Sequence, residues 1–269
     1  MYTPSKDLKH LQNVLLSIMK EIDSLCRKHN ITYYLNGGNA LGAIRHNGFI
    51  PWDDDFDIMM KYEDYTRFLE IARKELNPDK WFVQEAWKDW PGCFSKIRLK
   101  GTYLKDIGEW EGIAKENRGI YIDIFPIVNS PVGKFARKYQ YIAAKLINSY
   151  SLIKRGYKTS SRIKQLALAS SRLLGIPAIN KLCHRLVFKF ENEKPVSFGN
   201  FFGMSRFHNA FYSTNIFQVP YYHTYEDIKL PLPSDYDTYL RQSFGDYMKL
   251  PPLSQQKPAH SLHIDFGEY

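Results

Sequence analysis

Four aspartates within five positions form the part of the sequence best suited to chemistry. Residues 52–58 read WDDDFDI. Carboxylates this close repel one another, and burying them without compensation is costly, so a cation among them would be stabilising. On a strand Asp55 and Asp57 would share a face, roughly 7 Å apart at Cα. The pattern predicts that Asp55 and Asp57 bind Mg²⁺ or Mn²⁺ and that Asp53 lies beside them; a solvated acidic loop is the alternative.

A pair of glycines lies upstream of these carboxylates. Residues 35–42 read LNGGNALG, which predicts a strand that runs into a Gly-Gly turn and then a short helix over 39–45. The backbone amides of such a turn can cradle a phosphate. We therefore predict that Gly37, Gly38 and Asn39 contact substrate phosphate, the alternative being a tight turn that needs positive φ.

A third carboxylate is expected from a later strand. Asp123 is the single charge in YIDIF, residues 121–125, where it lies among apolar and β-branched residues. A buried, unpaired carboxylate is expensive, so Asp123 needs a partner. The sequence predicts a metal ion shared with Asp55 and Asp57, making all three catalytic together with Asp53; a salt bridge to Lys or Arg is the alternative.

Four further polar residues are candidates for substrate binding. Arg45 and His46 lie between the Gly-Gly turn and the carboxylate strand. Arg45 has the donor geometry to bind a phosphate with two hydrogen bonds, and a surface salt bridge is the alternative. Lys96 lies in an alternating strand that could face the same site. His260, near the C-terminal end, is a candidate for donor or acceptor contact. His260 and His263 have no other metal-type ligands nearby in the sequence, so no zinc site is predicted.

The elements around these residues mix helices and strands without strict alternation, which favours an α+β fold over a doubly wound sheet. A helix is predicted over 5–28 from an apolar stripe at steps of three and four. Further helices are predicted over 63–76, 134–152, 161–174, 179–190 and 234–244, and strands over 31–35, 56–60, 81–84, 94–99 and 120–125. Residues 101–119 read mostly as loop. We expect a catalytic core over 1–130, a basic helical segment over 131–195, and a C-terminal part over 196–269 that completes the active site.

Composition bounds the class of protein. The chain has 269 residues, of which 44% are hydrophobic and 24% charged, as in ordinary globular proteins. Its three cysteines are far apart, which disfavours a structural zinc site and a disulfide scaffold. No stretch approaches the roughly 18 apolar residues of a spanning helix. These features predict a cytoplasmic protein with reduced thiols.

The positive charge is concentrated in the middle of the chain. The net charge is +9, but residues 134–194 contain 14 Lys or Arg against only Glu191 and Glu193. Such a segment calls for an anionic partner. We predict peripheral, salt-sensitive contact with the anionic inner face of a membrane, and direct capture of an anionic acceptor is the alternative. Nucleic acid is not expected, because no RNA-binding signature or aromatic platform is present.

Three segments together resemble the LicD family, the phosphocholine transferases that decorate bacterial surface glycans. They are LNGGNALGAIRHNGFIPWDDDFDIMMKYEDYTRFL (35–69), IDIFPIVNSP (122–131) and FGDYMKLPP (244–252). The first is long and specific, whereas residues 134–215 carry no motif of the family. Two departures are Asn39, where Ser or Thr is common, and Lys257, near where the C-terminal His is often preceded by Arg.

The resemblance implies a nucleotidyltransferase-like mixed sheet flanked by helices. It also implies magnesium-dependent transfer of phosphocholine, or a similar phospho-alcohol, from a CDP-linked donor such as CDP-choline. The acceptor would be a hydroxyl of a cell-surface glycan, such as lipopolysaccharide or teichoic acid, or of its lipid-linked precursor. A template-independent nucleotidyltransferase acting on RNA or a small molecule would use the same carboxylates and is the alternative. A calcium-binding module is disfavoured, because the aspartates lack EF-hand spacing.

Overall fold

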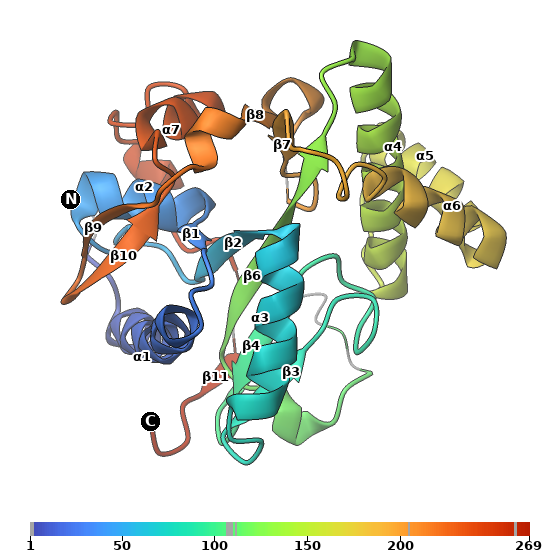
Figure 1. Ribbon diagram of the computed structural model, residues 1–269. Helices are drawn as coiled ribbons and strands as arrows, with labels where there is room; N and C mark the ends of the chain where they lie inside the picture. The colour runs from blue at the N-terminus through green and yellow to red at the C-terminus, as the bar shows by residue number, and fades with distance from the viewer. Residues whose placement is uncertain (1–2, 106–109, 111, 204, 261–262) are drawn as a thin grey trace.

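The predicted α+β class is confirmed in the computed structural model, which describes residues 3–105, 110, 112–203, 205–260 and 263–269 (Figure 1). Within these residues the helices are α1 (Lys6–Lys28), α2 (Gly37–His46), α3 (Tyr62–Glu75), α4 (Lys134–Lys154), α5 (Arg162–Ser171), α6 (Pro177–Val187) and α7 (Tyr236–Phe244). The strands are β1 (Tyr34–Leu35), β2 (Asp57–Lys61), β3 (Trp81–Gln84), β4 (Ser95–Leu99), β5 (Tyr103–Lys105), β6 (Tyr121–Ser130), β7 (Ser197–Gly199), β8 (Phe211–Ser213), β9 (Tyr221–Tyr225), β10 (Ile228–Leu232) and β11 (His263–Asp265).

The central sheet is mixed. Its main strand order is β1-β2-β6-β4-β3, with β2 and β6 parallel and the other neighbours antiparallel, and β7 and β8 extend it from the far end of β6. The register places Asp57 beside Asp123 and Asp123 beside Lys96. The sheet therefore brings together three candidate residues that are far apart in the sequence.

The two faces of the sheet have different roles. Cross-strand neighbours share a face, and Ser95 is paired with Ile124 on the face covered by α3, where the Tyr65 and Ser95 hydroxyls hydrogen-bond at 2.5 Å. Because side chains alternate along a strand, Lys96 and Asp123 point to the opposite face. The sequence thus separates an apolar, helix-covered face from a polar face.

Helix α1 forms for the reason that its sequence pattern predicts. The Ser5 hydroxyl accepts a hydrogen bond from the Leu8 amide at 3.1 Å and so caps the first turn. The stripe at steps of three and four is buried against the core; it comprises Leu8, Leu11, Leu15, Ile18, Ile22 and Leu25. The same helix anchors the C-terminal end of the chain, because the His10 ring stacks on Phe266 at 3.9 Å between centroids.

The basic segment forms three helices beside the sheet (Figure 1). Helix α4 packs through Ala143, Ala144 and Ile147, which are buried. Helix α5 is exposed along nearly its whole length and ends in a 3-10 turn over 172–175, so the predicted helix 161–174 is divided in two. Among the described residues no helix combines the length and the apolar character needed to cross a bilayer.

Several predicted boundaries were wrong. The predicted strand over 31–35 is reduced to Tyr34–Leu35. Residues 101–119, read as loop, contain β5, which pairs with β11; residues 106–109 and 111 of that loop lie outside the described residues. The β9–β10 hairpin and the short strands β7 and β8 were not predicted. These strands have three to five residues, too few for a period of two to be distinctive.

Candidate functional site

The carboxylates gather where β2 begins. Asp57 is the first residue of β2, and Asp53 and Asp55 lie in the loop before it. The Phe56 carbonyl accepts a hydrogen bond from the Asp123 amide at 2.9 Å, which joins this loop to β6. Phe56 and Ile58, which alternate with Asp55 and Asp57, are both buried, so the alternation in the sequence separates core from site.

The clustering of negative charge perturbs these groups. Burial raises the pKa of Asp55 to about 6. Burial, reinforced by repulsion from Asp55 and Asp123, holds the pKa of Asp57 well above its usual range. The pKa of Asp53 is raised in the same way, first by burial and then by Asp55 and Asp54. The ionised cluster is therefore short of positive charge, which is the condition that a bound cation would relieve.

Lys96 supplies one compensating charge. Its Nζ donates to Asp123 Oδ1 at 2.6 Å, and both side chains are largely buried. The ammonium also lies 3.4 Å from the centroid of the Tyr121 ring, which precedes Asp123 by two residues on β6. The alternative of a salt bridge for Asp123 is therefore realised, and the ion pair lies inside the carboxylate cluster.

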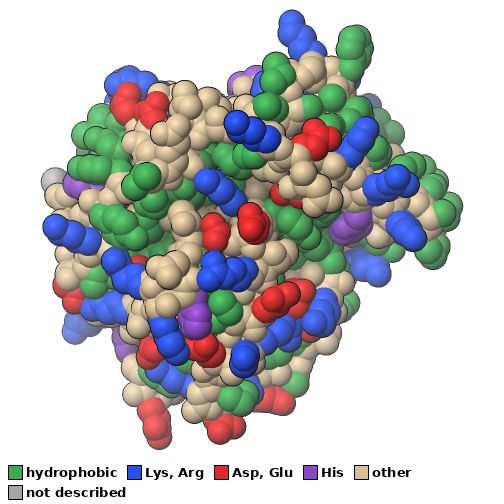
Figure 2. Space-filling view, in the orientation of Figure 1, with side chains coloured by type: hydrophobic (Ala, Val, Ile, Leu, Met, Phe, Trp, Pro, Cys, Tyr) green, Lys and Arg blue, Asp and Glu red, His purple; other side chains and the backbone are tan. Residues whose placement is uncertain are grey.

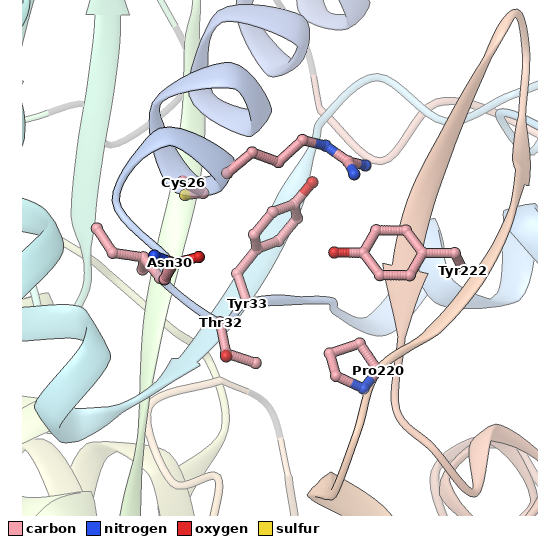
Figure 3. Close-up of a pocket in the computed structure, with 8 residues that line it drawn as sticks. Cys26, Asn30, Thr32, Tyr33, Pro220 and Tyr222 are labelled. Atoms are coloured by element: carbon pink, nitrogen blue, oxygen red, sulfur yellow. The ribbon is translucent and has the colours of Figure 1, made fainter.

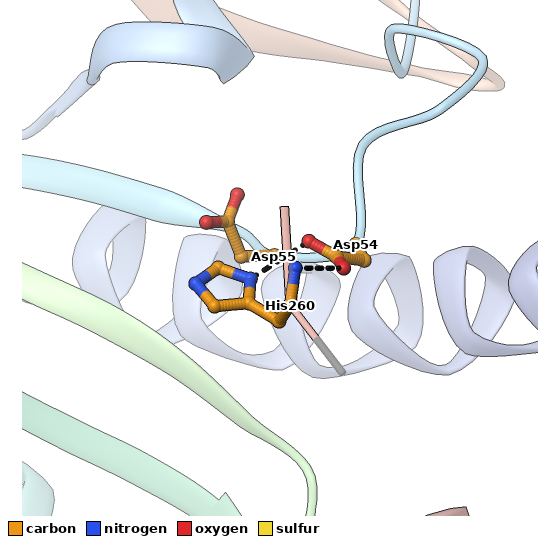
Figure 4. Close-up of side chains that lie close together, drawn as sticks. All are labelled: Asp54, Asp55 and His260. Atoms are coloured by element: carbon orange, nitrogen blue, oxygen red, sulfur yellow. Dashed lines mark hydrogen bonds and ion pairs between the residues drawn. The ribbon is translucent and has the colours of Figure 1, made fainter. Parts of the chain in front are cut away.

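His260 joins the site from the other end of the chain (Figure 4). The buried Asp54 carboxylate accepts a hydrogen bond from the His260 backbone amide at 3.0 Å and lies 2.8 Å from the ring Nδ1. With Nδ1–H donating to Asp54, Nε2 of a neutral ring would be an acceptor. Figure 4 shows this ring beside Asp55. Asp54 therefore fastens the C-terminal segment to the carboxylate loop.

One group of the described residues has the ligand set and spacing of a metal site. Asp54, Asp55 and His260 each offer a ligand atom, and these atoms lie within 4.8 Å of one another. The sequence predicted Asp55, Asp57 and Asp123 instead and found no metal-type ligands near His260. The expectation that His260 has no metal-type ligands nearby was wrong, because the fold brings Asp54 and Asp55 next to it.

The start of α2 differs from the predicted turn. The helix begins at Gly37, not at Asn39, and the Gly37 amide donates to the Tyr239 hydroxyl at 3.0 Å. A β-carbon at Gly38 would lie 2.8 Å from Asp53 Oδ2, so only glycine allows this close approach. Asp53 Oδ2 itself is buried and has no hydrogen-bond partner among the described residues. Its position near the N-terminus of a helix is electrostatically favourable.

Asn39 acts on the strand. Its side chain is buried, its Oδ1 accepts from the Asp57 amide at 2.6 Å, and its Nδ2 donates to the Tyr225 hydroxyl at 3.1 Å. These contacts give Asn39 a positioning role for Asp57, and the phosphate contact predicted for it stays a prediction. Tyr225 was not predicted from the sequence, because an aromatic residue in a short strand is too common to indicate a role in a site.

Arg45 and His46 lie at the far end of α2 from Gly38. Arg45 donates through Nη1 to the Tyr247 carbonyl and through Nε to the His46 ring, each at 2.9 Å. The His46 ring meets Trp52 edge-on at 6.2 Å between centroids. The structure therefore joins Arg45 and His46 to each other and to the C-terminal part, while Asp53, Asp55, Asp57, Asp123, Lys96 and His260 form the carboxylate site.

A separate pocket of about 370 Å³ lies between the end of α1 and the β9–β10 hairpin (Figure 3). Tyr33 and Tyr222 face each other across it. The Arg27 guanidinium lies 4.8 Å from the centroid of the Tyr222 ring and is fixed by Asp23 at 2.7 Å. Its lining residues come from a different part of the chain than the carboxylate site, so the pocket is not assigned to that site.

Comparison with known proteins identifies the family. Residues 30–146 match the family described as LicD/FKTN/FKRP, nucleotidyltransferase domain, and this range contains the carboxylate loop, Lys96 and Asp123. The chain is also 29% identical to the lipopolysaccharide cholinephosphotransferase LicD of Haemophilus influenzae, over 94% of its own length and 96% of that protein. Residues 30–146 therefore form a nucleotidyltransferase domain of the LicD family. The predicted family, the nucleotidyltransferase-like fold and the transferase class are thereby confirmed.

Other relatives match over shorter stretches of the chain. An uncharacterized protein of Rickettsia typhi is 46% identical over 57 residues, which are 21% of this chain and 18% of that protein. The mouse ribitol 5-phosphate transferase FKRP is 28% identical over 99 residues, 36% of this chain and 17% of that protein. Both relatives are thus matched along less than a fifth of their own length.

The Asp54–His260 contact leads to a first prediction. Replacing Asp54 with Asn leaves one oxygen to serve two His260 hydrogen bonds, so the ring loses its fixed orientation. For loss of a group that orients a functional histidine we expect kcat to fall about 10- to 100-fold. Steady-state rates and thermal unfolding of the variant would be compared with those of Glu268→Gln, an exposed change in the same segment. An unchanged kcat would contradict the role.

Proposed function

We propose that this protein transfers phosphocholine, or a similar phospho-alcohol, from a CDP-linked donor to a hydroxyl of a cell-surface glycan or its lipid-linked precursor. The observation that carries the proposal is the match to a lipopolysaccharide cholinephosphotransferase along almost the whole of both chains. The carboxylate site supports it, because a phosphoryl group carries negative charge that must be neutralised. Four aspartates before and at the start of β2, together with Asp123 on β6, could supply that neutralisation by holding a cation.

The cation that we propose is Mg²⁺ or Mn²⁺, held by Asp55, Asp57 and Asp123. Asp54 and His260 adjoin Asp55 and offer further ligand atoms. The residues fit such an ion, because most of the donor atoms are oxygens. Burial and repulsion from neighbouring carboxylates destabilise the Asp57 and Asp53 anions, and one Asp53 oxygen is buried with no hydrogen bond from the described part of the chain. When bound, the ion would neutralise donor phosphate oxygens and polarise the phosphorus.

The remaining roles fall to side chains of the chain itself. The acceptor hydroxyl attacks the phosphorus of the phosphocholine unit, a new P–O bond forms, and the bond to the bridging oxygen breaks, so that CMP leaves. We assign removal of the hydroxyl proton to His260 Nε2, supported by the contact of Nδ1 with Asp54. Asp53 is the alternative base, but its buried Oδ2 faces Gly38. The Lys96 ammonium opposes part of the rise that burial causes in the pKa of Asp55 and Asp57, and it can offset charge that develops on phosphate.

A donor screen tests the proposal. Purified protein, a lipopolysaccharide or lipid-linked glycan acceptor and each of several CDP-alcohols are combined, and release of CMP is measured. We expect turnover with CDP-choline or a related CDP-alcohol, complete loss with a chelator, and recovery with Mg²⁺ or Mn²⁺. Turnover that survives chelation would remove the metal from the proposal.

The nucleotide-transferring alternative is not favoured by the comparisons. The same assays separate it, since that activity would incorporate nucleotide into RNA or a small molecule and release pyrophosphate instead of CMP. We propose a cytoplasmic location for the enzyme, supported by its free cysteines Cys26, Cys93 and Cys183, all buried and unpaired in the structure.

A further inference from the structure

Helix α5 and the turn that follows it expose large apolar side chains. Ile163 is 81% exposed, Leu166 is 71% exposed, and Leu173 is 55% exposed. Ile176 and Leu182, at the start and on the outer side of α6, are also exposed. Large apolar side chains grouped on one short segment mark a contact surface more often than scattered ones do.

The spacing shows that this apolar stripe faces outward. Residues 163, 166 and 173 recur at helical steps and so lie on one side of α5 and its 3-10 extension. The core-facing positions are different ones: Ser171 and Leu174 are buried. The exposed stripe is therefore not needed to hold this segment against the rest of the protein.

The segment of sequence that contains the stripe carries positive charge and no acidic residue. Between residues 154 and 190 the chain has nine Lys or Arg and no Asp or Glu. On α5 itself Arg162 and Lys164 flank Ile163 and are exposed. Figure 2 shows green and blue side chains over the lobe at the right of the view, where Figure 1 places α6.

We propose that this surface, defined by Lys158, Arg162, Ile163, Lys164, Leu166 and Leu173, docks the protein on an anionic lipid bilayer. Lipid phosphates would meet the cations while Ile163, Leu166 and Leu173 enter the boundary between headgroups and acyl chains, as in interfacial helices. A nucleic acid would satisfy the cations but would gain nothing from the three apolar side chains.

The end of α4, which precedes the docking surface in the chain, contacts a residue beside the carboxylate site. The Arg155 guanidinium, at the end of α4, lies 5.2 Å from the centroid of the Trp90 ring. The Lys96 ammonium lies 5.2 Å from the centroid of the same ring and pairs with Asp123. Docking on a bilayer does not depend on the proposed function.

Co-sedimentation of the full chain with vesicles tests the proposal without any enzymatic readout. We expect binding to phosphatidylglycerol vesicles, little binding to phosphatidylcholine vesicles, and steep weakening between low and physiological salt. Lys158→Gln/Arg162→Gln/Lys164→Gln should lower the partition coefficient on the order of 100-fold. The matched control Lys6→Gln/Lys74→Gln/Lys249→Gln, with the same change in net charge at exposed sites elsewhere, should bind like the wild type.

A second pair of variants tests the apolar contact. Ile163→Ser/Leu166→Ser should lower binding at least about 10-fold while Val219→Ser/Leu253→Ser, also at exposed positions, leaves it unchanged. These side chains are exposed, so the variants are expected to fold. The proposal is overturned if the wild type ignores anionic vesicles at low salt, if the charge control loses binding equally, or if the apolar variant binds like the wild type.

Discussion

Replacing Asp55 or Asp57 with Asn is expected to lower turnover of the CDP-linked donor about 1000-fold or more. Loss of one group that stabilises transition-state charge typically costs 100- to 1000-fold, and a lost metal ligand also weakens ion binding. Asp57 is paired in register with Asp123, and Asp55 lies two residues before Asp57. Each carboxylate thus has its own position, so we expect that the remaining ones cannot replace a missing one. Addition of more Mg²⁺ should recover only part of the activity.

Stability separates this catalytic role from a structural one. Because burial and mutual repulsion raise the pKa of both carboxyls, a neutral amide at either position should relieve strain, and the melting temperature should stay equal or rise. The control is Asp79→Asn, an exposed aspartate in another loop, which should keep normal rate and stability. Near-normal turnover in Asp55→Asn or Asp57→Asn would refute the assignment.

The parts of the fold that were predictable have long local patterns. The apolar stripe of α1 extends over more than four turns, and each of its predicted positions is buried. The alternation around Asp57 and Asp123 likewise predicted two strands with one polar face, and the structure pairs those strands in register. In both cases the period of burial is written in neighbouring residues, so no tertiary knowledge is needed.

The unpredicted parts of the site depend on contacts between distant residues. Asp54 and His260 are separated by 206 positions, and Asn39 reaches Tyr225 across 186. No spacing rule joins such pairs. Asn39 shows the consequence. Its position after two glycines suggested a phosphate contact, but its side-chain oxygen accepts a hydrogen bond from the Asp57 amide. Polar residues near a motif can therefore be identified from sequence, but the groups that their side chains contact cannot.

The second large effect is expected at Asp123, where two explanations compete. As a metal ligand it would be essential for turnover, and as the partner of buried Lys96 it would be essential for stability. Asp123→Asn alone cannot separate these roles, because breaking a buried ion pair costs about 3–5 kcal/mol even without any catalytic loss. We expect this variant to lose turnover about 1000-fold and to melt at a lower temperature.

The double variant Asp123→Asn/Lys96→Met separates the two roles. Removing both charges leaves no uncompensated ammonium, and the methionine can pack on the Tyr121 ring that Lys96 now contacts. The melting temperature should therefore recover toward that of the wild type, as measured by thermal unfolding. Turnover should remain lost, because a metal ligand and a phosphate-facing cation are both absent. Recovery of turnover together with stability would mean that Asp123 serves only the ion pair. Asp55 and Asp57 would then have to hold the cation with Asp54 and His260, whose ligand atoms lie close to that of Asp55.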